Sequence, residues 1–223
     1  MLTAEKKMAY LSILREELVP ATGCTEPIAL AYASARLRDI LGTNPERIRA
    51  EVSGNIIKNV KSVVVPNSGG LKGICAAIAA GIIAGAAERA LQVISSVPAE
   101  LHETIAAYSQ DTPIEIACAD TTRMLDIRLT GWAGEHFASV HIANSHSNIV
   151  REERDGEVLL EKPVTDSTED SLTDKSVLNV ADILDFANTA ELEEIAPLLR
   201  RQIDCNTAIA EEGLQNDWEI GRA

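Results

Sequence analysis

The chain has 223 residues, 46% of them hydrophobic, so it is long enough to bury a substantial core as one large domain or two small ones. Its net charge is −14, and most of it falls in residues 151–223, where 7 Lys and Arg stand against 19 Asp and Glu. Binding to nucleic acid or to an anionic membrane depends on clustered cations, and we therefore expect neither partner. The longest uncharged run, 73–87, is too short to cross a bilayer and the N-terminus has no apolar signal core, which favours a cytoplasmic protein.

The first segment that calls for an explanation is a short break between two predicted helices, which contains Cys24. Apolar residues at helical spacing precede the break, Pro20 ends that helix, and a second helix is predicted from Ile28 to about Leu41 with Thr25 as its N-cap. A helix N-terminus favours the thiolate, the form that binds metals and attacks as a nucleophile, so we predict a lowered pKa for Cys24. The alternative is a small buried residue that fills a gap in a helix–helix turn.

Two adjacent segments then combine polar residues with glycines. Residues 53–66 follow a predicted strand at 47–52 and mix β-branched residues with Asn and Lys, which indicates either a solvated loop or the lining of a pocket for a small polar ligand. Residues 66–73 contain glycines and lead into an Ala-rich helix ending near Ile94, and backbone amides at such a helix start bind anions such as carboxylates. The alternative is that Ser68 is only an N-cap and that the glycines only permit the turn.

Strand patterns dominate the middle of the chain, after a short predicted helix at 98–108. Consecutive antiparallel strands are predicted for residues 113–119, 123–130 and 136–143. A hairpin with Asp155-Gly156 at its turn is predicted between residues 149–150 and 158–160. Five polar residues, 144–148, interrupt this ladder, and they contain His146, which of the four histidines is the one we favour for chemistry, although its local pattern favours a simple loop histidine. His102, His136 and His141 fit ordinary helix or strand patterns and are expected at the surface or in cross-strand pairs.

The remaining residues complete the expected fold. Residues 162–175 are rich in Asp, Glu, Ser and Thr and predict a solvated acidic linker, and helical spacing returns at 180–187, 192–199 and 203–214. The fold class is therefore α+β, with N-terminal helices, a mainly antiparallel sheet with an Ala-rich helix packed on it, and a helical C-terminal segment. The expected division is an α+β domain over 1–161, the linker over 162–175, and a helical segment over 176–223 that leads to an absent C-terminal half.

The four cysteines lie far apart in the sequence, at positions 24, 75, 118 and 205, without a Cys-x-x-Cys pair. This spacing argues against a local zinc site or a redox motif and indicates reduced thiols.

Several segments together resemble the iron–sulfur L-cysteine desulfidase family, which is related to the bacterial iron–sulfur L-serine dehydratases. They are Gly-Cys-Thr-Glu-Pro at 23–27, Ser-Gly-Asn-Ile-Ile-Lys-Asn at 53–59, Val-Pro-Asn-Ser-Gly-Gly-Leu-Lys-Gly at 65–73, Asn-Ser-His-Ser-Asn-Ile-Val at 144–150, and Glu-Glu-Gly at 211–213. The resemblance covers almost the whole chain in the same order. Members of the family are about twice this long, and their other cluster cysteines lie in a helical C-terminal half, so the ligand role is not extended to Cys75, Cys118 or Cys205.

The resemblance implies the N-terminal half of a lyase that uses a 4Fe-4S cluster, completed by a partner half, to release pyruvate, ammonia and sulfide or water from L-cysteine or L-serine. The cofactor ligand in this chain would be Cys24. The catalytic candidates are His146 and Lys58. The residues expected to bind the small amino-acid substrate are Glu26, Asn55, Asn67, Ser68, Gly69 and Asn148.

The expected partners are a separate C-terminal half or further copies of the chain. The alternative function is a non-catalytic remnant, a small-carboxylate binding protein without a cluster.

Overall fold

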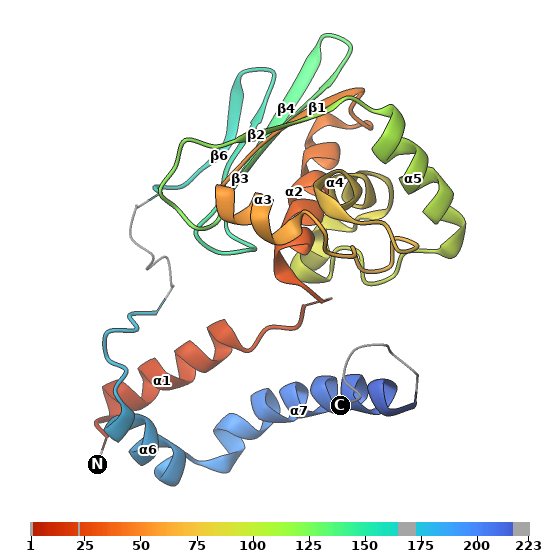
Figure 1. Cartoon of the computed structure of the whole chain (residues 1–223). Helices are drawn as coiled ribbons and strands as arrows, with labels where there is room; N and C mark the ends of the chain where they lie inside the picture. The colour runs from red at the N-terminus through yellow and green to blue at the C-terminus, as the bar shows by residue number, and fades with distance from the viewer. Residues whose placement is uncertain (1, 22, 165–172, 216–223) are drawn as a thin grey trace. The chain divides into compact units, whose positions relative to one another are not determined.

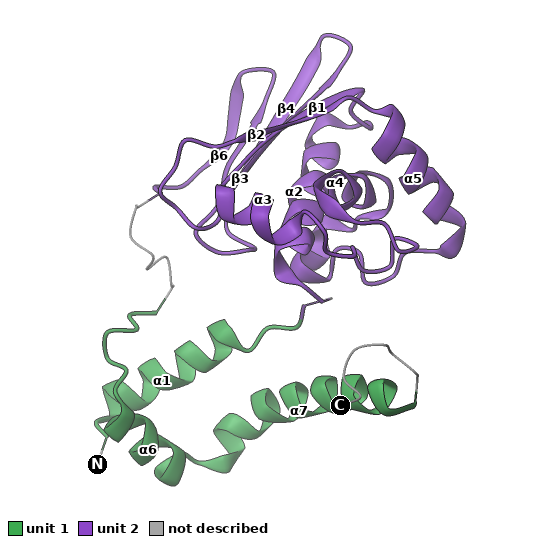
Figure 2. Ribbon diagram, in the orientation of Figure 1, with its two compact units in different colours: residues 1–20, 171–223 green, residues 21–170 purple. Residues whose placement is uncertain are grey.

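The structure is a computed structural model that describes residues 2–21, 23–164 and 173–215 (Figure 1). It divides into two compact units, residues 21–170 and residues 1–20 with 171–223 (Figure 2). The division predicted from the sequence places residues 1–20 with the sheet, whereas the structure groups them with the C-terminal helices.

The larger unit contains one six-stranded sheet in the order β2-β1-β3-β4-β5-β6. The strands are β1 (Arg47–Val52), β2 (Ile114–Cys118), β3 (Asp126–Ala133), β4 (His136–Ala143), β5 (Ile149–Arg154) and β6 (Glu157–Glu161). All neighbours are antiparallel except β1 and β2, which confirms the α+β class and the mainly antiparallel sheet. The prediction that β2 precedes β3 as its antiparallel neighbour is wrong, because β2 lies at the sheet edge, parallel to β1. A parallel pair needs a long crossover, and the helices between β1 and β2 provide it.

The helices of this unit lie on one face of the sheet (Figure 1). They are α2 (Thr25–Leu41), α3 (Gly54–Val60), α4 (Gly73–Ala84), α5 (His102–Asp111) and the short 3₁₀ helices η1 (Ala87–Gln92) and η2 (Ala99–Leu101). The helix that lies against β3, β4 and β5 is α2, and the Ala-rich α4 packs on α2 and α5. The prediction of one helix up to Ile94 is therefore too long, since α4 ends at Ala84 before the 3₁₀ turn.

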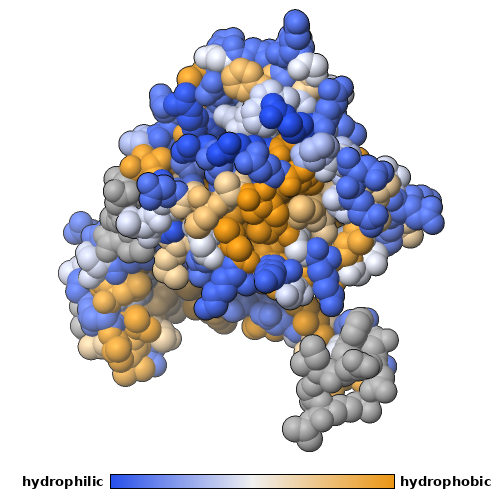
Figure 3. Space-filling model, turned by 45° about the horizontal axis from the view of Figure 1, so that its top comes forward, coloured by the Kyte–Doolittle hydropathy of each residue, from blue (hydrophilic) through white to orange (hydrophobic). Residues whose placement is uncertain are grey.

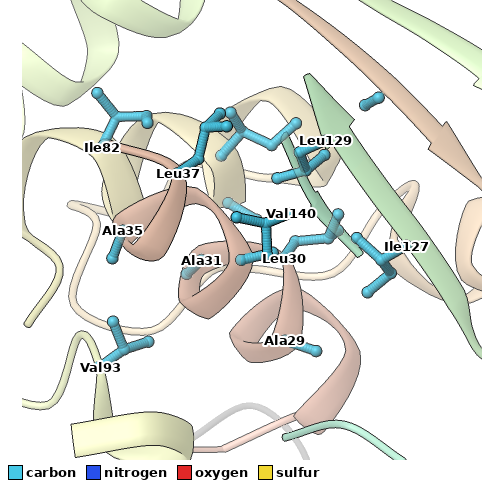
Figure 4. Close-up of a cluster of buried hydrophobic side chains, with 14 of the residues drawn as sticks. Ala29, Leu30, Ala31, Ala35, Leu37, Ile82, Val93, Ile127, Leu129 and Val140 are labelled. Carbon is cyan, nitrogen blue, oxygen red and sulfur yellow. The ribbon is translucent and has the colours of Figure 1, made fainter. Parts of the chain in front are cut away.

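The core of the larger unit forms where α2 meets the sheet and α4. Side chains of α2 such as Leu30 and Leu37 point toward the strands that carry Leu129 and Val140 (Figure 4), and all four are fully buried. Few aromatic residues are available, so aliphatic side chains and close helix contacts fill this core. On the face drawn in Figure 3, apolar residues gather in the middle of the larger body and polar residues surround them.

Glycine permits the closest of these contacts, between α4 and α2. A Cβ atom on Gly81 would lie 2.2 Å from the carbonyl oxygen of Ala31, and one on Gly85 would lie 2.7 Å from the Cβ of Ala35. The backbones of the two helices therefore meet directly, as the Ala and Gly content of this region predicts.

The smaller unit consists of α1 (Ala4–Glu17), α6 (Val180–Thr189) and α7 (Leu192–Gln215). Its small core contains Tyr10, Leu11 and Phe186, and the rings of Tyr10 and Phe186 are 5.3 Å apart. The sequence predicts two helices where the structure has the single helix α7, which continues through Pro197. Among the described residues, no helix is long and apolar enough to span a membrane.

Candidate functional site

Four of the segments that carry the family resemblance meet in the larger unit, next to the N-terminus of α2. Residues 23–26 form the start of this helix, and Asn59, at the end of α3, donates a hydrogen bond to Glu26 over 3.1 Å. Gly23 adopts a φ of 96°, and a Cβ on it would lie 3.0 Å from Pro66, the first residue of the 66–73 loop. His146 lies close enough for its charge to act on Glu26. Segments far apart in the sequence thus meet at residues 23–26, which contain Cys24.

The cysteine at this point, Cys24, is itself the N-cap of α2, and Thr25 is the first helical residue. The prediction of Thr25 as the N-cap is therefore wrong by one position, because Thr25 is already in the helix, three residues before its apolar pattern begins at Ile28. The side chain of Cys24 makes no capping bond to the helix backbone, and it is exposed. Exposure contradicts the alternative of a buried gap-filling residue.

The hydrogen-bond partner of Cys24 is Glu26, whose Oε2 lies 3.2 Å from Sγ. Partial burial and this carboxylate raise the pKa of the Cys24 thiol, and the nearby helix amides offset only part of the rise. The predicted lowering of this pKa is thus wrong. A helix N-terminus does stabilise a thiolate, but partial burial, together with the carboxylate two residues along the chain, disfavours it more strongly.

Glu26 is the residue that joins the site together. Burial alone would raise its pKa, but the Cys24 thiol, its own backbone amide, Asn59 and His146 together hold the pKa below its usual value. The carboxylate is therefore ionised at neutral pH. It accepts from a thiol on one oxygen and from an amide on the other.

Asn59 is a site residue that the sequence analysis does not select. It belongs to the segment 53–59, where Asn55 was chosen instead, and the helix α3 that places the two on the same face was not predicted. The available signal is the spacing of four residues between the two asparagines, which is the spacing of a helical face. Lys58 lies beside Asn59 and is exposed.

His146 lies in the loop between β4 and β5, at the end of the sheet. Burial lowers its pKa, and the charge of Glu26 opposes this shift in part. The imidazole is therefore neutral at pH 7 and able to accept a proton. Asn148 shapes the loop, because its side-chain amide donates to the carbonyl of Ala143 over 3.2 Å.

The 66–73 loop is held by its own side chains. The Ser68 hydroxyl donates to the carbonyl of Val65 over 2.8 Å and is buried, and the side-chain amide of Asn67 donates to the carbonyl of Ile94 over 2.9 Å. Ser68 is not an N-cap, since α4 begins at Gly73 with Lys72 in that position. The Ser68 hydroxyl and the Asn67 amide therefore stabilise the loop, and its backbone groups are what it can offer to a ligand.

The tip of this loop rests on a histidine that the sequence analysis sets aside. A Cβ on Gly69 would lie 3.1 Å from the ring of His102, the first residue of α5. The Nε2 atom of His102 is buried and has no hydrogen-bond partner among the described residues.

The donor set fits one ligand position of an iron–sulfur cluster. Cys24 offers an exposed sulfur at a fixed point of the fold. Within residues 2–21, 23–164 and 173–215, no three His, Cys, Asp or Glu side chains come together in a way that could hold a metal ion. The further ligands of a cluster would come from outside this part of the chain.

The chain is similar to bacterial proteins described as UPF0597 proteins. It is 45% identical over 215 residues to one from Desulfitobacterium hafniense, 43% over 220 residues to one from Treponema denticola, and 46% over 215 residues to one from Lachnoclostridium phytofermentans. The alignments cover 96%, 98% and 96% of this chain and 50%, 51% and 51% of the relatives. The chain thus spans about half the length of the curated relatives it matches. No family model and no solved structure matches it.

Proposed function

We propose that this chain is the N-terminal half of a 4Fe-4S dependent lyase, an L-cysteine desulfidase or L-serine dehydratase that forms pyruvate, ammonia and sulfide or water. The observation that carries the proposal is the meeting of four resembling segments at residues 23–26, next to the thiol of Cys24. The length of the relatives, about twice that of this chain, is consistent with a second half that supplies the remaining ligands.

In this proposal Cys24 provides one thiolate to the cluster. When bound, such a cluster supplies an iron with an open position, which acts as a Lewis acid on the thiol, hydroxyl or carboxylate of the substrate. The proton of the Cys24 thiol must leave before the sulfur binds a metal, and Glu26 is the acceptor already hydrogen-bonded to it.

His146 is the residue that takes the Cα proton of the substrate. A histidine acts as a general base in its neutral form, and burial favours this form of His146 by lowering its pKa. The Glu26 carboxylate stabilises the imidazolium that forms, because opposite charges close together favour the charged state. Asn59 fixes the carboxylate in place and so acts as a positioning residue.

The substrate carboxylate would be bound by α3 and the 66–73 loop. Lys58 is exposed on α3 and offers a positive charge, and Asn55 lies one helical turn before Asn59. The 66–73 loop contributes backbone amides rather than the side chains of Asn67 and Ser68, which are engaged within the loop. Both elements lie next to residues 23–26.

The test compares two exposed cysteines. The chain, its Cys24→Ala variant and its Cys118→Ala variant are reconstituted anaerobically with iron and sulfide, each alone and each mixed with the part of the Desulfitobacterium hafniense relative that this chain does not span. We expect iron–sulfur absorption and pyruvate formation from L-cysteine or L-serine only in mixtures that contain Cys24. Cluster and activity that survive Cys24→Ala, or their loss in Cys118→Ala alone, would contradict the proposal.

A second candidate function is a small-carboxylate binding protein without a cluster. The observation that favours it is the backbone of the 66–73 loop, where Asn67, Gly69 and Gly70 have positive φ angles. In the described structure, the N–H groups of residues 67–70 donate no hydrogen bond. Such consecutive free amides form anion-binding concavities. Protection of these amides from hydrogen exchange by pyruvate, together with inactive mixtures in the first experiment, would favour this function.

A further inference from the structure

The face of the sheet opposite its helices carries a row of basic side chains. The register places Arg128 on β3 opposite His141 on β4, and His141 opposite Arg151 on β5. Side chains opposite one another on neighbouring strands lie about 5 Å apart, and like charges in such positions are destabilising. A chain with a net charge of −14 has many acidic residues with which to neutralise this row.

Two members of the row are neutralised within the chain. Arg151 pairs with Glu153 at 3.0 Å and with Glu161 at 2.8 Å. His141 is buried, and its Nε2 lies 2.9 Å from Oδ1 of Asp126. The histidine is thus held in one orientation by a carboxylate.

Arg128 is the member without a partner. It is exposed, and no described residue forms an ion pair or hydrogen bond with its guanidinium. The carboxylate directly opposite it on β1 belongs to Glu51, which instead lies 3.3 Å from Arg49. The row therefore contains one guanidinium that forms no ion pair with any described residue.

The row also borders a hollow of the right size for a small ligand. The hollow has a volume of about 280 Å³ and is lined by Arg128, Ser139, His141, Arg151 and Glu153. Ser139 adds a hydroxyl two residues before His141 on the same face of β4. Two guanidinium groups and a hydroxyl are the donors that bind phosphate and carboxylate groups in proteins.

We propose that this hollow binds a small oxyanion, a phosphate or carboxylate group, between Arg128 and Arg151. The anion would neutralise Arg128 and accept from the Ser139 hydroxyl, while Glu153 holds the second guanidinium in place. The site shares no residue with the site at Cys24, so it is a second ligand site, independent of the proposed lyase function. A phosphate or a short carboxylate fits within this volume.

The experiment is a titration of the chain at low ionic strength, by calorimetry, with inorganic phosphate and separately with acetate. Arg128→Gln should weaken binding about tenfold, since it removes a charge-assisted hydrogen bond. The matched control is Arg89→Gln on η1, which removes the same charge away from the hollow and should leave the affinity unchanged, because Arg89 does not line the hollow and donates to Ser96. Circular dichroism checks that both variants are folded.

Each outcome decides the proposal. Phosphate binding without acetate binding assigns a phosphorylated ligand, and binding of both extends the site to carboxylates. The proposal is overturned if neither anion binds at concentrations up to about 10 mM, because a specific site would bind more tightly than that. It is also overturned if Arg128→Gln binds as tightly as the unaltered chain, or if Arg89→Gln weakens binding equally, since binding would then follow overall charge.

Discussion

Replacing Gly81 by Ala measures how closely α4 packs on α2. The new Cβ would lie 2.2 Å from the carbonyl oxygen of Ala31 and 2.8 Å from its Cα, whereas ordinary nonbonded contacts are about 3.5 Å. The neighbour is backbone and cannot rotate away, so the two helices must separate by roughly 1 Å. Overpacking of a core costs about 1–3 kcal/mol, and backbone overlap places this case at the upper end, even after the gain of about 1 kcal/mol in helix propensity.

The assay is urea unfolding, followed by the fluorescence of Trp132 in a Trp218→Phe background. A loss of about 3 kcal/mol corresponds to a fall in melting temperature of roughly 6–12 °C for a unit of this size. The matched control is Gly213→Ala in α7, where no atom lies within 4 Å of the new Cβ, and this change should not destabilise the chain. A Gly81→Ala variant that unfolds at the same or a higher urea concentration would refute the reasoning.

Three further predictions concern charged side chains. Glu26→Gln should speed the alkylation of Cys24 at pH 7, because burial and the Glu26 carboxylate raise the pKa of the thiol; equal rates would contradict this. Burial would raise the pKa of Asp126, but His141 and Arg123 together hold it below its usual value. The ionised carboxylate therefore stabilises the fold above a pH of about 4, and this stabilisation is lost as the pH falls through the folded-state pKa. Asp126→Asn should remove this part of the acid sensitivity in urea titrations across pH. Arg36→Met should cost about 1–3 kcal/mol, because it removes the bidentate partner of the buried Glu152 at 2.6 and 2.9 Å, and adding Glu152→Met should recover part of the loss in the same assay.

Local chemistry accounts for the parts of the fold that could be predicted from the sequence. Asp155 and Gly156 both have positive φ angles, 51° and 89°, as a two-residue hairpin turn requires. Gly42 ends α2 with a φ of 84°, as its position after the apolar pattern predicts. In each case a few neighbouring residues determine the conformation.

Pairings between distant segments could not be predicted in this way. The alternating pattern of β2 identifies a strand but does not identify its neighbour, and β2 pairs with β1 across three α-helices and two 3₁₀ helices. Helix α3 has only seven residues, too few to establish a helical period among its Asn and Lys residues. Its absence from the prediction also hid the position of Asn59.

The sequence predicted several residues of the candidate site, but it did not predict how their charges affect one another. Cys24, Glu26 and His146 were all selected from the sequence, and the structure brings them together. The predicted direction of the Cys24 pKa shift was wrong, because an argument from the helix N-terminus alone omits the burial of the sulfur and the charge of Glu26 beside it. Only the folded geometry shows which effect is the larger.

The burial of α2 also determines how the site can move. Local opening of a protein costs little in exposed loops and nearly the full free energy of unfolding in its core elements. A shift of α2 would break its contact with Gly81 and expose side chains such as Leu30, so the helix as a whole keeps its position until the unit unfolds. Cys24 stands at the exposed start of this helix. A ligand that reaches this sulfur therefore meets a side chain whose backbone is anchored in the core.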